Sequence, residues 1–204
     1  MFIKIYKKMK KCWLFVIFIL FITFGISAQD VSSENTHLKF KGIDIAGDLS
    51  LMVERLQKEG FTLVTQENIF ALMEGEFANK QCELFVVATP STYEVYEVIV
   101  NFKKTNSWSS LKSDYLEFKN LLKGKYNTEP KSVEKFLKPY YEGDGYEMTA
   151  LSVNKCRYVS VFNLDNGSIA VAIASEKSVN VVYEDKIGSF INEQEKKEIS
   201  INDL

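Results

Sequence analysis

Residues 107–124 read SWSSLKSDYLEFKNLLKG, and the spacing of their apolar side chains predicts a helix. These side chains recur every three or four residues, which places them on one helix face: Trp108, Leu111, Tyr115, Phe118 and Leu122. Leu121 is expected to widen the stripe. Ser107 can cap the first turn, and Gly124 can end the helix in the left-handed conformation. We therefore expect this helix to cover an apolar surface, either a sheet or the seam of a dimer.

Strand-like segments lie on both sides of this helix. The pattern before it predicts a strand over 38–45, a helix over 48–59 capped by Asp48, and strands over 61–64, 69–77, 82–89 and 92–103. The pattern after it predicts a helix over 131–138, strands over 146–153, 156–164, 168–175 and 179–183, and a helix over 190–199. Asn166-Gly167 between two strand-like runs predicts a hairpin.

The two β-rich halves resemble each other in sequence. Residues 79–86 read NKQCELFV and residues 154–161 read NKCRYVSV. We therefore predict an α+β protein made of two tandem helix-plus-antiparallel-sheet (α-β-β-β) units, 29–106 and 107–186, with a tail over 187–204. The alternative is a chance likeness between strands, which draw on a small set of residue types.

The N-terminus predicts export. Residues 1–28 contain five lysines near the start, an apolar run over 13–25, and Ile26-Ser27-Ala28 as a cleavage site, which together are typical of a signal peptide. The protein is therefore expected to be periplasmic or secreted. The alternative is a membrane anchor that is not cleaved, although the apolar run is shorter than a usual membrane span.

Charge argues against some partners. Without residues 1–28 the chain keeps 20 basic and 27 acidic residues, a net charge of −7. An acidic protein has no general electrostatic attraction to nucleic acid or to an anionic membrane. We therefore expect neither nucleic acid nor, after signal cleavage, a membrane as a partner.

Two cysteines remain after signal cleavage, Cys82 and Cys156, at matching places in the two halves. Export favours a disulfide between them, because the compartment is oxidising. Two buried free thiols are an equal alternative, since free cysteine is among the most buried residue types.

Familiar catalytic patterns are scarce. The single histidine, His37, lies in a polar lead, so a Ser-His-Asp triad would depend on the segment least expected to be rigid. One histidine excludes a multi-histidine metal site. No glycine-rich phosphate-binding loop is present, and no cofactor is predicted.

The segment 140–147 carries the candidate site residues. Glu142, Asp144 and Glu147 surround two glycines, which suggests a calcium loop or the paired acids of a hydrolase, although the spacing does not match an EF-hand. A solvated turn is the simpler interpretation. As a binding patch we select Tyr140, Tyr141, Asp144 and Tyr146, because tyrosines are enriched at interfaces.

Several short patterns resemble a group of small secreted proteins from Gram-negative gut bacteria. They are Phe40-x-Gly42-Ile43-x-Ile45-x-Gly47, Leu56-x-Lys58-x-Gly60-Phe61, Gly75-x-Phe77-Ala78 with Cys82, and the Trp108–Leu122 stripe. The predicted fold is also similar to the tandem repeats of β-lactamase-inhibitor-protein-like modules and to small envelope-assembly lipoproteins. These resemblances imply an architecture and carry no functional residues over.

The sequence thus favours an exported, non-catalytic binding or envelope-associated protein, whose partner would be another envelope or secreted protein. Two alternatives remain: a carboxylate-dependent hydrolase, and a structural dimeric envelope protein.

Overall fold

The predicted central helix is present as α3 (Trp108–Tyr126). Its first turn is capped as expected, because the Ser107 hydroxyl accepts a hydrogen bond from the Ser110 N–H. The predicted end at Gly124 is wrong, since the helix continues and Asn127 follows it in the left-handed conformation, with φ 48°. Asparagine tolerates this conformation better than other residues with a side chain, so it can take the place of glycine.

The apolar stripe of α3 faces the sheet. Leu111, Tyr115, Phe118 and Leu122 are buried, and the Phe118 ring stacks on Phe102 of the sheet with centroids 4.3 Å apart. Leu121 is 53% exposed, so the prediction that it widens the stripe is wrong. The expectation of a helix covering a sheet is confirmed.

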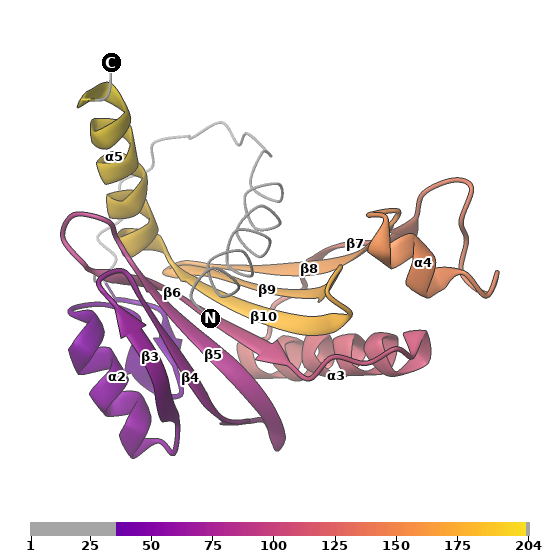
Figure 1. Ribbon diagram of the computed structural model, residues 1–204, viewed down its shortest axis with the longest axis horizontal. Coiled ribbons are helices and arrows are strands. Elements are labelled where there is room, and N and C mark those ends of the chain that lie inside the picture. The colour runs from indigo at the N-terminus through magenta and orange to yellow at the C-terminus, as the bar shows by residue number, and fades with distance from the viewer. Residues whose placement is uncertain (1–35, 203–204) are drawn as a thin grey trace. The chain divides into compact units, whose positions relative to one another are not determined.

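Figure 1 shows the computed structural model, which describes residues 36–202; the predicted signal peptide, residues 1–28, lies outside the described residues. A small hairpin of β1 (Lys39–Phe40) and β2 (Ile43–Asp44) replaces the single strand predicted over 38–45. The first helix within residues 36–202, α2 (Leu49–Lys58), has its predicted cap, because the Asp48 carboxylate accepts hydrogen bonds from the N–H groups of Ser50 and Leu51.

One antiparallel sheet of eight strands, in the order β3-β4-β5-β6-β10-β9-β8-β7, forms the centre of the described protein. Its strands are β3 (Thr62–Glu67), β4 (Phe70–Phe77), β5 (Lys80–Ala88), β6 (Val95–Phe102), β7 (Lys131–Phe136), β8 (Cys156–Leu164), β9 (Gly167–Ala174) and β10 (Ser178–Asp185). The predicted strands over 69–77, 82–89, 92–103, 156–164, 168–175 and 179–183 are therefore confirmed, with small shifts at their ends.

The predicted fold of two tandem α-β-β-β units is wrong. Four strands follow α2 before the next long helix, and four follow α3 before the last one. β6 and β10 pair with each other, for example Val100 with Val181, so a single sheet runs across the boundary expected between residues 106 and 107. This pairing gives hydrogen-bond partners to the backbone N–H and C=O groups of β6 and β10, which would otherwise be edge strands. It joins residues far apart in the chain, which a local pattern does not reveal.

Two short elements have the opposite structure from the prediction. Residues 131–138, expected to be helical, contain the edge strand β7, which pairs with β8 along its whole length. Residues 146–153, expected to be a strand, contain α4 (Glu147–Ser152), which buries Ala150 and Leu151. In both places tertiary pairing and packing override a weak local preference.

The two faces of the sheet are covered differently. α2 and α3 pack on one face, which we call the helix face, where alternating strand residues such as Met73, Leu84 and Val181 are fully buried. The opposite face, which we call the second face, contacts only the last helix, α5 (Lys186–Asn202), among the helices of residues 36–202. The predicted helix over 190–199 is thus confirmed and is longer. None of the helices in this described range is long and apolar enough to cross a membrane.

Candidate functional site

The predicted tyrosine patch lies in the loop before α4, and its tyrosines are not all on the surface. Tyr141 and Tyr146 are 65% and 63% exposed, whereas Tyr140 packs against the core. The Asp144 carboxylate accepts hydrogen bonds from the N–H groups of Tyr141 and Tyr146, at 3.0 and 2.7 Å. Asp144 therefore shapes the loop, and two of the three tyrosines point outward.

The neighbouring carboxylates also have local partners. Glu142 accepts hydrogen bonds from the Lys112 ammonium and, at 3.1 Å, from the Tyr158 hydroxyl. The hydrogen bond from Lys112 lowers the pKa of Glu142. Glu147 accepts a hydrogen bond from the Gly143 N–H at 2.8 Å. A hydrolase needs one acid with a raised pKa, and the pKa of Glu142 shifts in the opposite direction.

His37 is anchored to a buried carboxylate, which the sequence pattern did not indicate. Its Nδ1 lies 3.0 Å from Oδ2 of Asp185, a fully buried residue at the end of β10. Asp185 also accepts hydrogen bonds from the N–H groups of Leu38 and Gly188, at 2.7 and 2.9 Å. This carboxylate therefore ties the start of the described chain to the first turn of α5.

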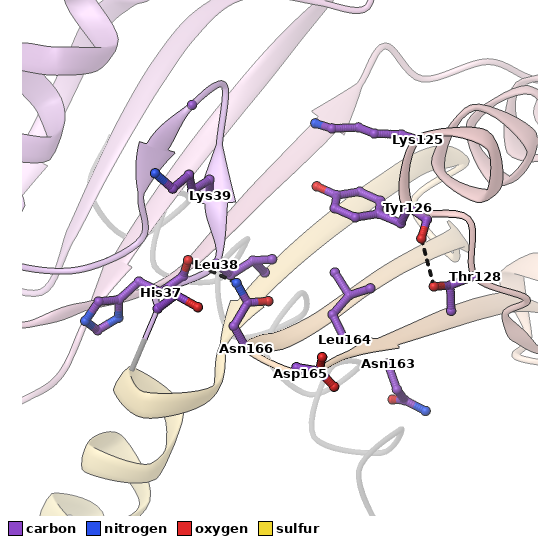
Figure 2. Close-up of a pocket in the computed structure, with 12 residues that line it drawn as sticks. His37, Leu38, Lys39, Lys125, Tyr126, Thr128, Asn163, Leu164, Asp165 and Asn166 are labelled. Carbon is purple, nitrogen blue, oxygen red and sulfur yellow. Dashed lines mark hydrogen bonds between the residues drawn. The ribbon is translucent and has the colours of Figure 1, made fainter. Parts of the chain in front are cut away.

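A cleft of about 750 Å³ lies beside this anchor. Figure 2 shows the His37 ring directed away from Tyr126 and Leu164, and the Asn166 amide donating a hydrogen bond to the His37 carbonyl at 3.1 Å. Within residues 36–202, no hydroxyl or thiol hydrogen-bonds to the imidazole, and no group of three His, Cys, Asp or Glu side chains could hold a metal ion. The His37–Asp185 pair thus has a structural role in this arrangement.

Cys82 and Cys156 are free thiols on buried positions of the helix face. Three strands lie between β5 and β8, so strand spacing alone separates these cysteines by about 19 Å, well beyond the Cα separation of a disulfide. Burial raises the pKa of Cys82 to about 11 and that of Cys156 to about 12. The structure therefore agrees with the interpretation of two buried free thiols and not with a disulfide between Cys82 and Cys156.

The second face carries a row of apolar side chains. Cross-strand pairing places six of them side by side from β4 to β8: Leu72, Phe85, Ile99, Val182, Ala170 and Val161. We call this set the apolar row. Phe85 is 8% exposed and the other five are half-buried. Alternation along each strand could have indicated these residues, but their alignment depends on the order of the strands.

Polar groups lie beside the apolar row. Asn101 pairs with Asn180 across β6 and β10 on the same face. The Asn101 side chain is 8% exposed, and its Oδ1 has no hydrogen-bond partner within residues 36–202. An unsatisfied buried acceptor is costly, so a donor brought in by a bound molecule would be favourable here.

Two carboxylates occupy the end of the second face beneath α5. Glu97 is 5% exposed and pairs directly with Glu184 on β10. Burial, and then the charge of Glu184, raise the pKa of Glu97 to about 8, and burial also raises the pKa of Glu184. Burial lowers the pKa of the nearby Lys196 ammonium. At this end the second face is closed by α5, so the apolar row and its polar neighbours form the remaining surface.

Comparison with known proteins found no matching family model, no matching curated protein and no matching solved structure. The resemblance to small secreted proteins of gut bacteria therefore stays a prediction.

Proposed function

We propose that this chain is an exported, non-catalytic binding protein whose second face binds a partner protein. The observation that carries the proposal is the apolar row, which crosses six strands on the face that α2 and α3 leave uncovered. Single exposed apolar residues are ordinary on a protein surface, whereas a contiguous apolar strip marks a binding site.

The surroundings of the row favour a polypeptide as the partner. An apolar centre with a polar rim is the usual composition of a protein interface. Asn101 offers an acceptor that a backbone N–H or an amide of the partner would satisfy. Glu74 and Glu76 on one side, and Lys135 on the other, are exposed charges that would fix the orientation of a partner with complementary charges.

Export is supported by the N-terminal sequence alone. Five lysines, an apolar run and a small-residue cleavage site precede Gln29. After signal cleavage the chain has a net charge of −7, so it would repel nucleic acid. In the periplasm or outside the cell, another exported protein is therefore the more suitable partner. The mass of the protein recovered from producing cells tests this part, and a chain beginning at Gln29 is the expected result.

Site-specific photo-crosslinking tests the binding surface. In cells that express the protein, a benzophenone amino acid replaces Val182 or Ala170 on the second face. In the matched controls it replaces Leu116 or Leu121 on the outer side of α3. We expect protein adducts from positions 182 and 170 and none from positions 116 and 121. Circular dichroism verifies that each variant is folded. Folded variants without adducts at 182 and 170, or with equal adducts at all four positions, would refute the proposal.

A further inference from the structure

The last helix, α5, packs on the sheet through small and polar residues. Its buried residues are Gly188, Asn192 and Glu195, which share one side of the helix. The buried side of α3, in contrast, consists of two leucines, a tyrosine and a phenylalanine. The apolar side chains of Phe190 and Ile201 on α5 are 63% and 58% exposed. Because apolar burial contributes most of the free energy that holds elements together, α5 is held on the sheet less firmly than α3.

Polar contacts fasten α5 at two points. The Glu195 carboxylate accepts hydrogen bonds from the N–H groups of Ser91 and Thr92, at 2.7 and 3.2 Å, in the loop between β5 and β6. In the first turn of the helix, the Gly188 N–H donates to the Asp185 carboxylate at 2.9 Å. The Glu195 contacts form a latch, because they hold the part of α5 that lies farther from β10.

Between these points α5 covers the pair of carboxylates on Glu97 and Glu184. Within residues 36–202, the charged and titratable groups that face this pair come from α5 and β6. They are Glu193 and Lys196 on α5, and Tyr96 next to Glu97. The neighbouring strands β5 and β9 contribute Val87 and Ser168, which pair with Glu97 and Glu184 and carry no charge.

Ionisation of Glu97 would weaken this cover. The Lys196 ammonium faces three carboxylates, those of Glu97, Glu184 and Glu193. Burial, and then the charge of Glu184, raise the pKa of Glu97 to about 8, so the closed helix retains a proton that a solvated carboxyl would lose. Opening of α5 therefore releases a proton, and the open population should rise with pH.

Opening would also enlarge the second face. Glu97 and Glu184 lie two residues along their strands from Ile99 and Val182 of the apolar row, and therefore on the same face. Release of α5 would uncover a further row of side chains beside the apolar row. A partner that contacts both rows would bind more tightly to the open form.

We infer that α5 is a detachable strap that covers part of the second face, and that ionisation of the carboxylates beneath it releases the strap and increases partner binding. The inference rests on the proposed function and names how the same surface is regulated. Local opening of this kind is expected for an element that buries few apolar side chains.

Amide hydrogen exchange of the protein recovered from producing cells tests the opening. Protection factors, which correct for the pH dependence of intrinsic exchange, are compared between residues 192–196 of α5 and the strand β10. The opening constant of α5 should rise between pH 4.5 and about 8, by at most about tenfold for each pH unit, while β10 stays protected.

Two variants separate the cause of this rise. Glu97→Gln should remove most of it, whereas Glu198→Gln, which changes an exposed carboxylate of the same helix, should retain it. Protection of α5 that does not change with pH, or an equal rise in Glu97→Gln and the wild type, would overturn the inference.

Photo-crosslinking from position 170 connects the strap to binding. Glu195→Ala removes the latch, so the yield of protein adducts in producing cells should increase several-fold over the wild type, whereas Glu198→Gln should leave it unchanged. Hydrogen exchange verifies that α5 is open in Glu195→Ala, and circular dichroism verifies that the sheet is folded.

The two proposals fail differently. If adducts form from position 170 but their yield is the same with α5 open and closed, α5 is no strap, and the binding function of the second face stands. If no variant forms adducts, the proposed function fails and the regulatory role of α5 fails with it.

Discussion

The helix face and the second face consist of alternating residues of the same strands, yet they have different surroundings. On the helix face, Leu84 and Val100 are fully buried beneath α2 and α3. On the second face, Ile99 and Val182 are half-buried beside amides and carboxylates. One set of side chains holds the fold together, and the other set is the surface to which we assign binding in the proposed function. Substitutions on the two faces should therefore affect different measurements.

The largest loss of stability is expected on the helix face. Phe118→Ala should lower the free energy of unfolding by about 3–5 kcal/mol, because it leaves a cavity against Phe102 and Phe77. Denaturant unfolding followed by circular dichroism measures this loss. A change below about 1 kcal/mol would mean that α3 does not carry the core.

The carboxylate pair under α5 should make stability depend on pH. The pKa of Glu97 is about 8 in the folded protein and 4.5 as a free side chain, so the folded state binds more protons between these values. The free energy of unfolding should therefore fall as pH rises from 4.5 to about 8. The fall is at most about 1.4 kcal/mol for each pH unit by which the folded and unfolded pKa values of Glu97 differ.

Glu97→Gln is the matched control for this pH dependence, because it keeps the shape of the side chain and cannot ionise. Its unfolding free energy should vary less over the same pH range, and amide hydrogen exchange should show α5 more protected than in the wild type at pH 8. If the unfolding free energies of the two proteins depend equally on pH, the ionisation of Glu97 is not the cause of the loss of stability.

A smaller effect is expected on the second face. Ile99→Ala removes a half-buried side chain, so the free energy of unfolding should fall by about 1 kcal/mol. The same unfolding experiment compares it with Phe118→Ala. A loss as large as that of Phe118→Ala would mean that the second face is part of the folding core and has no spare surface for a partner.

Most local elements could be predicted from the sequence because their signals are local. Asp48 and Ser107 cap their helices, and Asn166-Gly167 marks the turn between β8 and β9. The errors have long-range causes. β7 is a strand because β8 provides its hydrogen-bond partners, and the eight strands form one sheet because β6 pairs with β10.

The candidate surface was harder to predict than the fold. The sequence predicts a binding patch in the tyrosine loop because its residue types are typical of interfaces. The apolar row, in contrast, is composed of ordinary strand residues. Leu72 and Val161 are on the same row only because five strand pairings connect them. The His37–Asp185 contact joins residues 148 positions apart, so no local signal pointed to it.

The most direct test of the difference between the faces uses two adjacent residues of β10. Val181 is fully buried on the helix face and Val182 is half-buried on the second face, so the same substitution to lysine probes both. We predict that Val181→Lys prevents folding, and that Val182→Lys unfolds within about 1 kcal/mol of the wild type but no longer forms crosslinks from position 170. Equal destabilisation by the two substitutions, or crosslinks from position 170 that persist in Val182→Lys, would contradict the assignment of binding to the second face.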